Sequence, residues 1–238
     1  YFWKIILKLS HKFIIVSRKQ KKTLPKIIQN QSILLGNPYI NWYSDNLKKN
    51  SKIFLRKNFQ IPDNFIIVSV IGNIIPLKRL DVILKAAKLL DEINIKILII
   101  GNSYKGHISD LKKLIDNDNK EKIKFIEYTE SIENFFMGSD MVVATSQNDA
   151  SGRSIIESMY SKTFVIANNA GGHTDIITDN KNGILYKKND HEDLAKKIVH
   201  FYYNQQLYDQ IVTNAYNYAN NNYNLNKYIY KIEKLYSS

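Results

Sequence analysis

The chain has 238 residues, of which 44% are hydrophobic and 24% charged, so its composition is that of a folded globular protein and excludes a wholly disordered one. It contains no cysteine, which excludes disulfides and thiolate metal sites and fits a reducing compartment. The formal net charge is +12, and the first 62 residues carry all of the excess, with thirteen lysines and arginines against the single acid Asp45.

The basic first quarter allows two interpretations. It could contact an anionic membrane surface, or it could follow from the Lys, Asn and Ile bias of the whole chain. No nucleic-acid-binding motif lies beside it, so we expect no nucleic-acid partner. Within it, Lys4, Lys8 and Lys12 recur every fourth residue, which predicts a lysine-faced helix and interrupts any membrane-spanning run. The start on Tyr1, without a signal-like segment, predicts a fragment of a cytoplasmic protein.

Up to residue 62 the apolar pattern is broken into short pieces. The predicted elements are a strand at 13–16, a basic helix from 17 to 24, a strand at 33–35 and a turn at 36–38. Residues 39–62 are polar, aromatic and irregular, so we expect a linker without regular structure there. We therefore assign residues 1–60 to the end of one domain and an interdomain linker.

From Phe65 onward, short apolar runs alternate with amphipathic segments. We expect strands at 65–71, 95–100, 122–126, 141–144, 164–167 and 183–186, and helices at 81–90, 108–115, 132–137, 154–160, 174–177 and 191–203. Such alternation predicts the α/β fold class, with a doubly wound, Rossmann-like parallel sheet covered on both faces. The tail at 205–238 has a helical period, with Tyr228, Ile232 and Leu235 on one stripe.

The stretch D149-A-S-G-R-S-I-I-E157 joins a predicted strand to a predicted helix, at the sheet edge where doubly wound folds bind ligands. Gly152 would let the backbone approach a ligand closely, and the N–H groups of 153–155 could bind phosphate. Glu157 could accept hydrogen bonds from ribose hydroxyls. Asp149 could face whatever lies beyond the phosphates, or it could be an ordinary turn residue. The five histidines are scattered, so we expect surface or helix-capping residues and no metal.

Several segments taken together are similar to family 4 of the retaining GT-B glycosyltransferases. The stretch from Asp149 to Glu157 resembles that family's two acids separated by seven residues. V70-I-G-N-I-I-P-L-K78 resembles its G-R-L-x-x-x-K loop, and A170-G-G-H-T-D175 resembles its G-G-x-x-E turn. The order and spacing of these motifs agree between residues 65 and 200.

The resemblance implies a site for a nucleotide sugar. Lys78 matches the family's diphosphate-binding lysine, and Asn73 stands where the family has a partner arginine. Arg79 or Arg153 could replace that missing charge. Asp149 matches the acid near the reacting sugar carbon, although the family has glutamate there. The implied catalytic residues are Asp149 and Lys78, and the implied donor-binding residues are Gly72, Asn73, Lys78, Gly101, Ile126, Ser151, Gly152, Arg153, Ser154 and Glu157.

The resemblance also implies the domain division. Residues 61–204 would form the nucleotide-sugar-binding domain, and residues 205–238 a helical tail that packs back toward an N-terminal domain. Most of that N-terminal domain, which supplies the acceptor site in the family, is expected to lie outside the sequence.

The implied reaction moves a sugar from a nucleotide-diphosphate donor to an acceptor hydroxyl with retention, without a metal or other cofactor. The acceptor would be a carbohydrate or a lipid-linked molecule in cell-envelope polysaccharide or glycolipid synthesis, in the cytoplasm or at the inner face of the membrane. Asn73, Asp149 and Ser151 depart from the family pattern, and they favour the alternative of a non-catalytic subunit that binds a nucleotide sugar. A nucleotide-sugar epimerase and a basic surface-binding module remain open as further classes.

Overall fold

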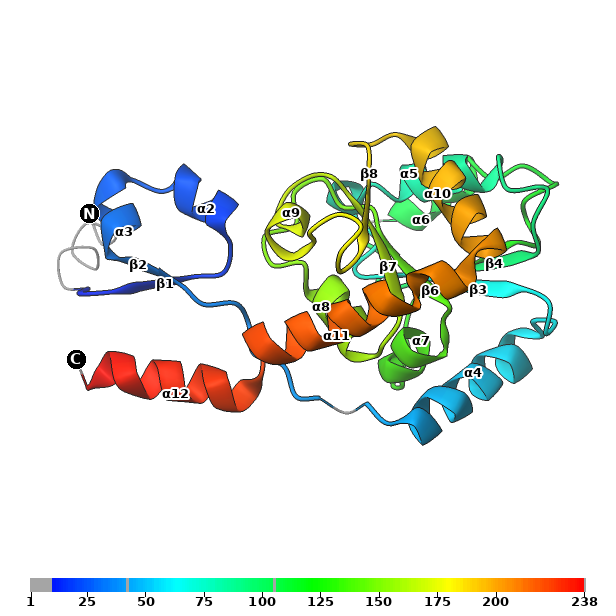
Figure 1. Ribbon diagram of the computed structural model, residues 1–238. Helices are drawn as coiled ribbons and strands as arrows, with labels where there is room; N and C mark the ends of the chain where they lie inside the picture. The colour runs from blue at the N-terminus through cyan, green and yellow to red at the C-terminus, as the bar shows by residue number, and fades with distance from the viewer. Residues whose placement is uncertain (1–9, 42, 105, 238) are drawn as a thin grey trace.

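In the computed structural model, which describes residues 10–41, 43–104 and 106–237, six strands form one parallel sheet (Figure 1). They are β3 (Ile66–Ile71), β4 (Ile95–Ile100), β5 (Ile123–Ile126), β6 (Met141–Ala144), β7 (Phe164–Asn168) and β8 (Ile184–Tyr186). The spatial order is β5-β4-β3-β6-β7-β8, and every neighbouring pair is parallel. The predicted doubly wound α/β fold is confirmed. In this order the chain reverses its direction of winding between β3 and β6, which places a topological switch point there.

Helices cover both faces of the sheet (Figure 1). One face carries α5 (Leu80–Ala87), α6 (His107–Lys112) and α10 (His191–Tyr203), and the other carries α4 (Asp45–Phe59), α7 (Ile132–Gly138), α8 (Arg153–Tyr160) and α11 (Asp209–Asn222). Successive strand residues point to opposite faces, so Val68 packs with the first group and Ile67 with the second. Both are fully buried, which is why the strands are continuous apolar runs in the sequence.

The segment before the sheet contains the predicted strands and helix. Strands β1 (Phe13–Ile15) and β2 (Ser32–Leu34) pair in parallel, and α2 (Arg18–Thr23) and α3 (Lys26–Gln31) connect them. Helix α3 was not predicted. The predicted lysine-faced helix falls largely on residues 1–9, which lie outside the described residues.

The expectation of an irregular linker over 39–62 is wrong, because α4 occupies most of it. The helix begins where the Ser44 hydroxyl accepts a hydrogen bond from the Leu47 amide, and it ends at Gln60, whose backbone is left-handed. Only Ser51 and Leu55 are buried within it, so its apolar stripe is too sparse to stand out from the lysines and asparagines. Its close contact with α7 at Gly138 stabilises it, since a Cβ on Gly138 would lie 2.6 Å from the Ser51 carbonyl oxygen.

The tail is helical, as predicted. It forms α11 and then α12 (Leu225–Tyr236), which runs beside the β1–β2 segment in Figure 1. The stripe of Tyr228, Ile232 and Leu235 is the half-buried side of α12. None of the helices in the described part of the chain is both long and apolar enough to cross a lipid bilayer.

Candidate functional site

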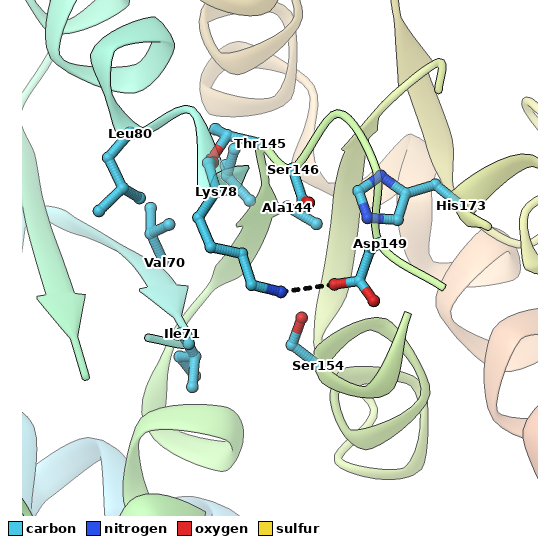
Figure 2. A pocket seen from close by; sticks show the side chains of 12 residues that line it. Val70, Ile71, Lys78, Leu80, Ala144, Thr145, Ser146, Asp149, Ser154 and His173 are labelled. Atoms are coloured by element: carbon cyan, nitrogen blue, oxygen red, sulfur yellow. Dashed lines mark hydrogen bonds and ion pairs between the residues drawn. The ribbon is translucent and has the colours of Figure 1, made fainter. Parts of the chain in front are cut away.

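A small cavity of about 20 Å³ lies at the carboxyl ends of β3 and β6, at the switch point of the sheet (Figure 2). It is lined by Val70, Ile71, Gly72, Lys78, Leu80, Val143, Ala144, Thr145, Ser146, Asp149, Ser154 and His173. Ligands of open α/β sheets bind at this position. A volume of this size holds about one water molecule.

An ion pair spans the cavity. The Lys78 Nζ atom lies 2.6 Å from Asp149 Oδ2, although 71 residues separate the two in sequence. Lys78 ends a short 3₁₀ turn, Pro76–Lys78, which the loop after β6 holds in place. The Thr145 hydroxyl donates to the Lys78 carbonyl at 2.5 Å, and the Ser146 hydroxyl donates to the Leu77 carbonyl at 3.3 Å. The lysine is therefore fixed at its backbone, while its ammonium reaches across to the acid (Figure 2).

Asp149 is held by four donors. Its Oδ1 atom accepts hydrogen bonds from the amides of Ser151 at 3.2 Å and Gly152 at 3.1 Å, and its backbone carbonyl accepts one from Gly172 at 2.7 Å. Burial acts to raise the pKa of the Asp149 carboxyl, but the Lys78 ammonium and the two amides outweigh it and lower that pKa overall. Asp149 is thus an ionised carboxylate at neutral pH that bonds both to its own turn and to Lys78.

Close backbone approaches shape the loops around the cavity. A Cβ atom on Gly101 would lie 2.0 Å from the Gly72 carbonyl oxygen, so the ends of β3 and β4 meet only because residue 101 is glycine. A Cβ atom on Gly172 would lie 2.7 Å from the Ala150 carbonyl oxygen. These glycines let the ends of β3 and β4 approach each other, and likewise the loops after β6 and β7.

Glu157 lies one turn into α8 and pairs with Arg153, whose Nε atom is 2.9 Å from Glu157 Oε1. The glutamate side chain is 12% exposed, whereas the arginine side chain is 74% exposed. Burial raises the pKa of the Glu157 carboxyl, and the hydrogen bond from Arg153 partly offsets this effect. A largely buried acid with one exposed cation beside it can accept hydrogen bonds from a ligand with hydroxyl groups.

Sequence reasoning missed His173, which we expected to be a surface or capping residue. The imidazole is 1% exposed and lines the cavity beside Asp149 (Figure 2). Its Nδ1 atom lies 3.1 Å from the Asn168 carbonyl oxygen, which can only accept, so a neutral ring carries its proton on Nδ1. Burial lowers the pKa of His173, which favours the neutral form. The only sequence signal was its place beside Gly171 and Gly172.

Comparison with known proteins identifies the family. The family model described as Glycosyl transferases group 1 matches residues 51–218. The chain belongs to this family. Among curated members, it is 33% identical over 167 residues to the poly(ribitol-phosphate) alpha-N-acetylglucosaminyltransferase of Staphylococcus aureus (strain COL), a match that covers 65% of this chain and 33% of that protein.

Solved glycosyltransferases share the fold. Anabaena Alr3699/HepE, in complex with UDP and glucose, superposes with a TM-score of 0.89 at 19% identity over 98% of this chain and 65% of its own. The C-terminal domain of the group 1 glycosyl transferase LpcC from Francisella tularensis gives 0.66 at 22% identity over 80% of this chain and 97% of its own. The chain therefore has the fold of a GT-B C-terminal domain, and it spans less than two thirds of its longer relatives.

The structure brings part of the predicted site of this family member together. Gly72, Lys78, Asp149 and Ser154 line the cavity, with Asn73 next to Gly72 and Gly101 packed against it. Ile126 lies one strand further out, where its carbonyl accepts the Gly101 amide. Ser151 and Arg153 line a neighbouring cavity of about 190 Å³.

The expectation that the amides of 153–155 are free to bind phosphate needs correction. The Ile155 amide donates to the Gly152 carbonyl inside the helix, so it is not available to a phosphate. Arg79, which could replace the charge missing at Asn73, is not among the residues that line the cavity, and Asp81 holds its guanidinium with two hydrogen bonds of 2.8 and 2.9 Å. Among the residues that the structure describes, no cluster of three or more His, Cys, Asp or Glu side chains could hold a metal.

Proposed function

We propose that this chain is the donor-binding part of a glycosyltransferase that moves a sugar from a nucleotide-diphosphate donor to an acceptor hydroxyl with retention. The observation that carries the proposal is the Lys78 ammonium, held at the switch point of a doubly wound sheet within a family of glycosyl transferases. An ammonium at that edge of the sheet suits a diphosphate, because ligands bind there and the charge on the departing nucleotide grows during transfer.

Each charged group has one proposed role. Lys78 binds the diphosphate and stabilises its charge as the bond to the sugar breaks. Glu157 accepts hydrogen bonds from the ribose hydroxyls. Asp149 faces the sugar. In the structure the Asp149 carboxylate accepts hydrogen bonds from the Lys78 ammonium and from the amides of Ser151 and Gly152. When the donor binds, its phosphate oxygens replace this carboxylate as the partner of the Lys78 ammonium. No metal is assigned a role.

The alternative is a subunit that binds a nucleotide sugar without turning it over. Asn73 in place of the family's arginine favours it, since Arg79 is held by Asp81 and leaves Lys78 as the cation in the cavity. One missing hydrogen bond to a charged group costs about 1.5–3 kcal/mol. Nucleotide binding without release of nucleotide from any donor sugar would support this alternative.

We also propose a carbohydrate or lipid-linked acceptor, and contact between the basic first segment and an anionic membrane. The support for membrane contact is the positive charge of this segment, because residues 1–62 contain thirteen lysines and arginines and only one acid. A cytoplasmic location at the inner face of the membrane would suit both proposals.

Calorimetric titration with UDP, GDP and ADP tests the donor site. We expect one of the three nucleotides to bind selectively. Lys78→Ala should weaken the affinity for that nucleotide by about ten- to hundredfold and leave the affinity for the free nucleoside nearly unchanged, because only the diphosphate contacts the ammonium. Glu157→Ala should weaken the binding of the nucleotide and of the nucleoside by the same factor, because both carry the ribose. Lys85→Ala is the control, since this half-exposed lysine on α5 pairs with Asp81 outside the cavity. A folded wild-type chain that binds none of the three nucleotides would contradict the proposal.

A further inference from the structure

Strand β5 is the outermost strand of the sheet, and in the part of the chain that the structure describes no strand pairs with its outer edge. The Ile97 amide of β4 donates to the Lys122 carbonyl, so the backbone groups of Lys122 face β4. Because the direction of these groups alternates along a strand, the amides and carbonyls of Ile123 and Phe125 point away from β4. Such an edge can pair with a further strand.

A groove of about 610 Å³ follows this edge, and we call it the edge groove. Ile123, Lys124 and Phe125 all line it. Successive strand residues point to opposite faces of a sheet, so the edge groove borders β5 from both faces. Its apolar part consists of Ile115, Ile123 and Phe125, of which Ile123 is buried and the other two are half-buried.

The charge of the edge groove is positive. Glu121 is the one acid among the described residues that line it, against four lysines, which are Lys96, Lys112, Lys120 and Lys124. Other lysines of this region each pair with an acid: Lys88 with Asp116, Lys113 with Asp110 and Lys122 with Asp91. No acid of the described residues forms an ion pair with Lys112, Lys120 or Lys124. The edge groove therefore lacks the local compensation that the neighbouring lysines have.

Two of the lysines act on each other. The Lys96 ammonium donates to the Glu121 carbonyl. Burial lowers the pKa of Lys96, and the charge of Lys124 lowers it further, against the opposite effect of the Glu121 charge. A negatively charged partner in the edge groove would offset this repulsion.

We propose that the edge groove binds an acidic, extended polypeptide segment that adds to β5 as a further strand. Side chains of such a segment alternate between the two faces, so its apolar side chains pack on Ile123 and Phe125 and its carboxylates meet Lys96 and Lys124. An anionic lipid surface matches the charge but offers no strand to the edge of β5. Lys96 and Ile123 stand near the beginnings of β4 and β5, whereas the donor cavity lies at carboxyl ends of strands. The partner therefore leaves the donor cavity open.

The probe is a synthetic peptide of about eight residues in which glutamate and valine alternate, long enough to extend past both ends of β5. We expect it to bind and to slow hydrogen exchange at the Ile123 and Phe125 amides, because these amides become hydrogen-bonded. Lys124→Glu should weaken the affinity by about tenfold, since it turns an attraction between strands into a repulsion. Lys113→Glu is the matched control: it makes the same charge change at an exposed lysine of α6 outside the edge groove, and it should leave the affinity nearly unchanged.

Two further probes separate strand pairing from charge alone. The same peptide with every amide N-methylated keeps its side chains but cannot donate to a strand edge, so it should not bind. Equal binding of the two peptides, unchanged exchange at Ile123 and Phe125, or no binding of the unmethylated peptide would overturn the proposal. Vesicles that contain phosphatidylglycerol are the second probe. Vesicle binding that Lys124→Glu abolishes, without binding of the peptide, would also overturn it and would assign the edge groove to an anionic membrane surface.

Discussion

The contact between Gly101 and Gly72 allows a sharp prediction about the substitution Gly101→Ala. The new methyl group would lie 2.0 Å from the Gly72 carbonyl oxygen and 3.2 Å from the Asn73 amide nitrogen, and both are backbone atoms. Neither strand end can shift easily, because the Gly72 amide donates to the Ile100 carbonyl and the Gly101 amide donates to the Ile126 carbonyl, each at 2.9 Å. The methyl group therefore has to displace the loop that leads to Lys78.

Two costs contribute to the expected loss of stability. Gly101 has φ +150°, and a residue with a side chain held in such a region costs about 1–3 kcal/mol. Forcing an extra methyl group into packed surroundings costs about 1–3 kcal/mol more. We expect the free energy of unfolding to fall by about 2–6 kcal/mol, which lowers the melting temperature on the order of 10 °C in a chain of this size.

Gly106→Ala is the matched control. Gly106 also has a positive φ, +72°, but the nearest atom that its methyl group would meet is the Ser109 hydroxyl oxygen at 3.8 Å. The free energy of unfolding of this variant should fall only by the conformational cost of a side chain at positive φ, about 1–2 kcal/mol. Urea denaturation of both variants, followed by circular dichroism, measures the difference, and nucleotide titration shows whether the Lys78 loop has moved. If Gly101→Ala is no less stable than Gly106→Ala, the backbone contact does not constrain the site and the reasoning is wrong.

The remaining predictions concern Lys48 and the basic segment. Burial lowers the pKa of Lys48 from 10.5 to about 8. Between pH 8 and 10 the unfolded chain therefore binds more protons than the folded one, and the free energy of unfolding should rise by about 1 kcal/mol per pH unit. Urea denaturation at pH 8 to 9.5 measures this slope, and Lys48→Met should remove most of it; a flat wild-type profile would contradict the assignment. For the basic segment, we expect the chain to sediment with vesicles that contain phosphatidylglycerol, less so at high salt, and binding to neutral phosphatidylcholine vesicles alone would refute an electrostatic contact.

Much of the sheet domain could be predicted from the sequence, because a strand that is buried on both faces is a continuous apolar run in the sequence. The run at 95–100 and the run at 141–144 coincide with β4 and β6 at both ends. The helix at 191–203 was also predicted with its observed bounds, since its apolar residues recur with a helical period. The fold class follows from the alternation of such runs along the chain.

Helix α4 shows where this reasoning fails. Its sequence is mostly lysine, asparagine and scattered apolar residues, and its most buried side chain is Leu55. Three hydrogen bonds from Lys48 to the turn between α8 and β7, and the approach of Ser51 to Gly138, hold it in place. These are contacts with residues more than eighty positions away, so no local pattern records them.

The same division applies to the candidate site. The sequence by itself determined the local parts: a glycine before a helix, two acids eight residues apart on one loop and helix, and a lysine after a strand. Only the tertiary structure decided that Lys78 meets Asp149, that His173 is buried beside them, and that Tyr39 stacks on Tyr160 of α8. The physical reason is that periodicity and turn chemistry act between near neighbours in the chain, whereas these pairs are set by strand order and by the packing of loops that approach only through glycine.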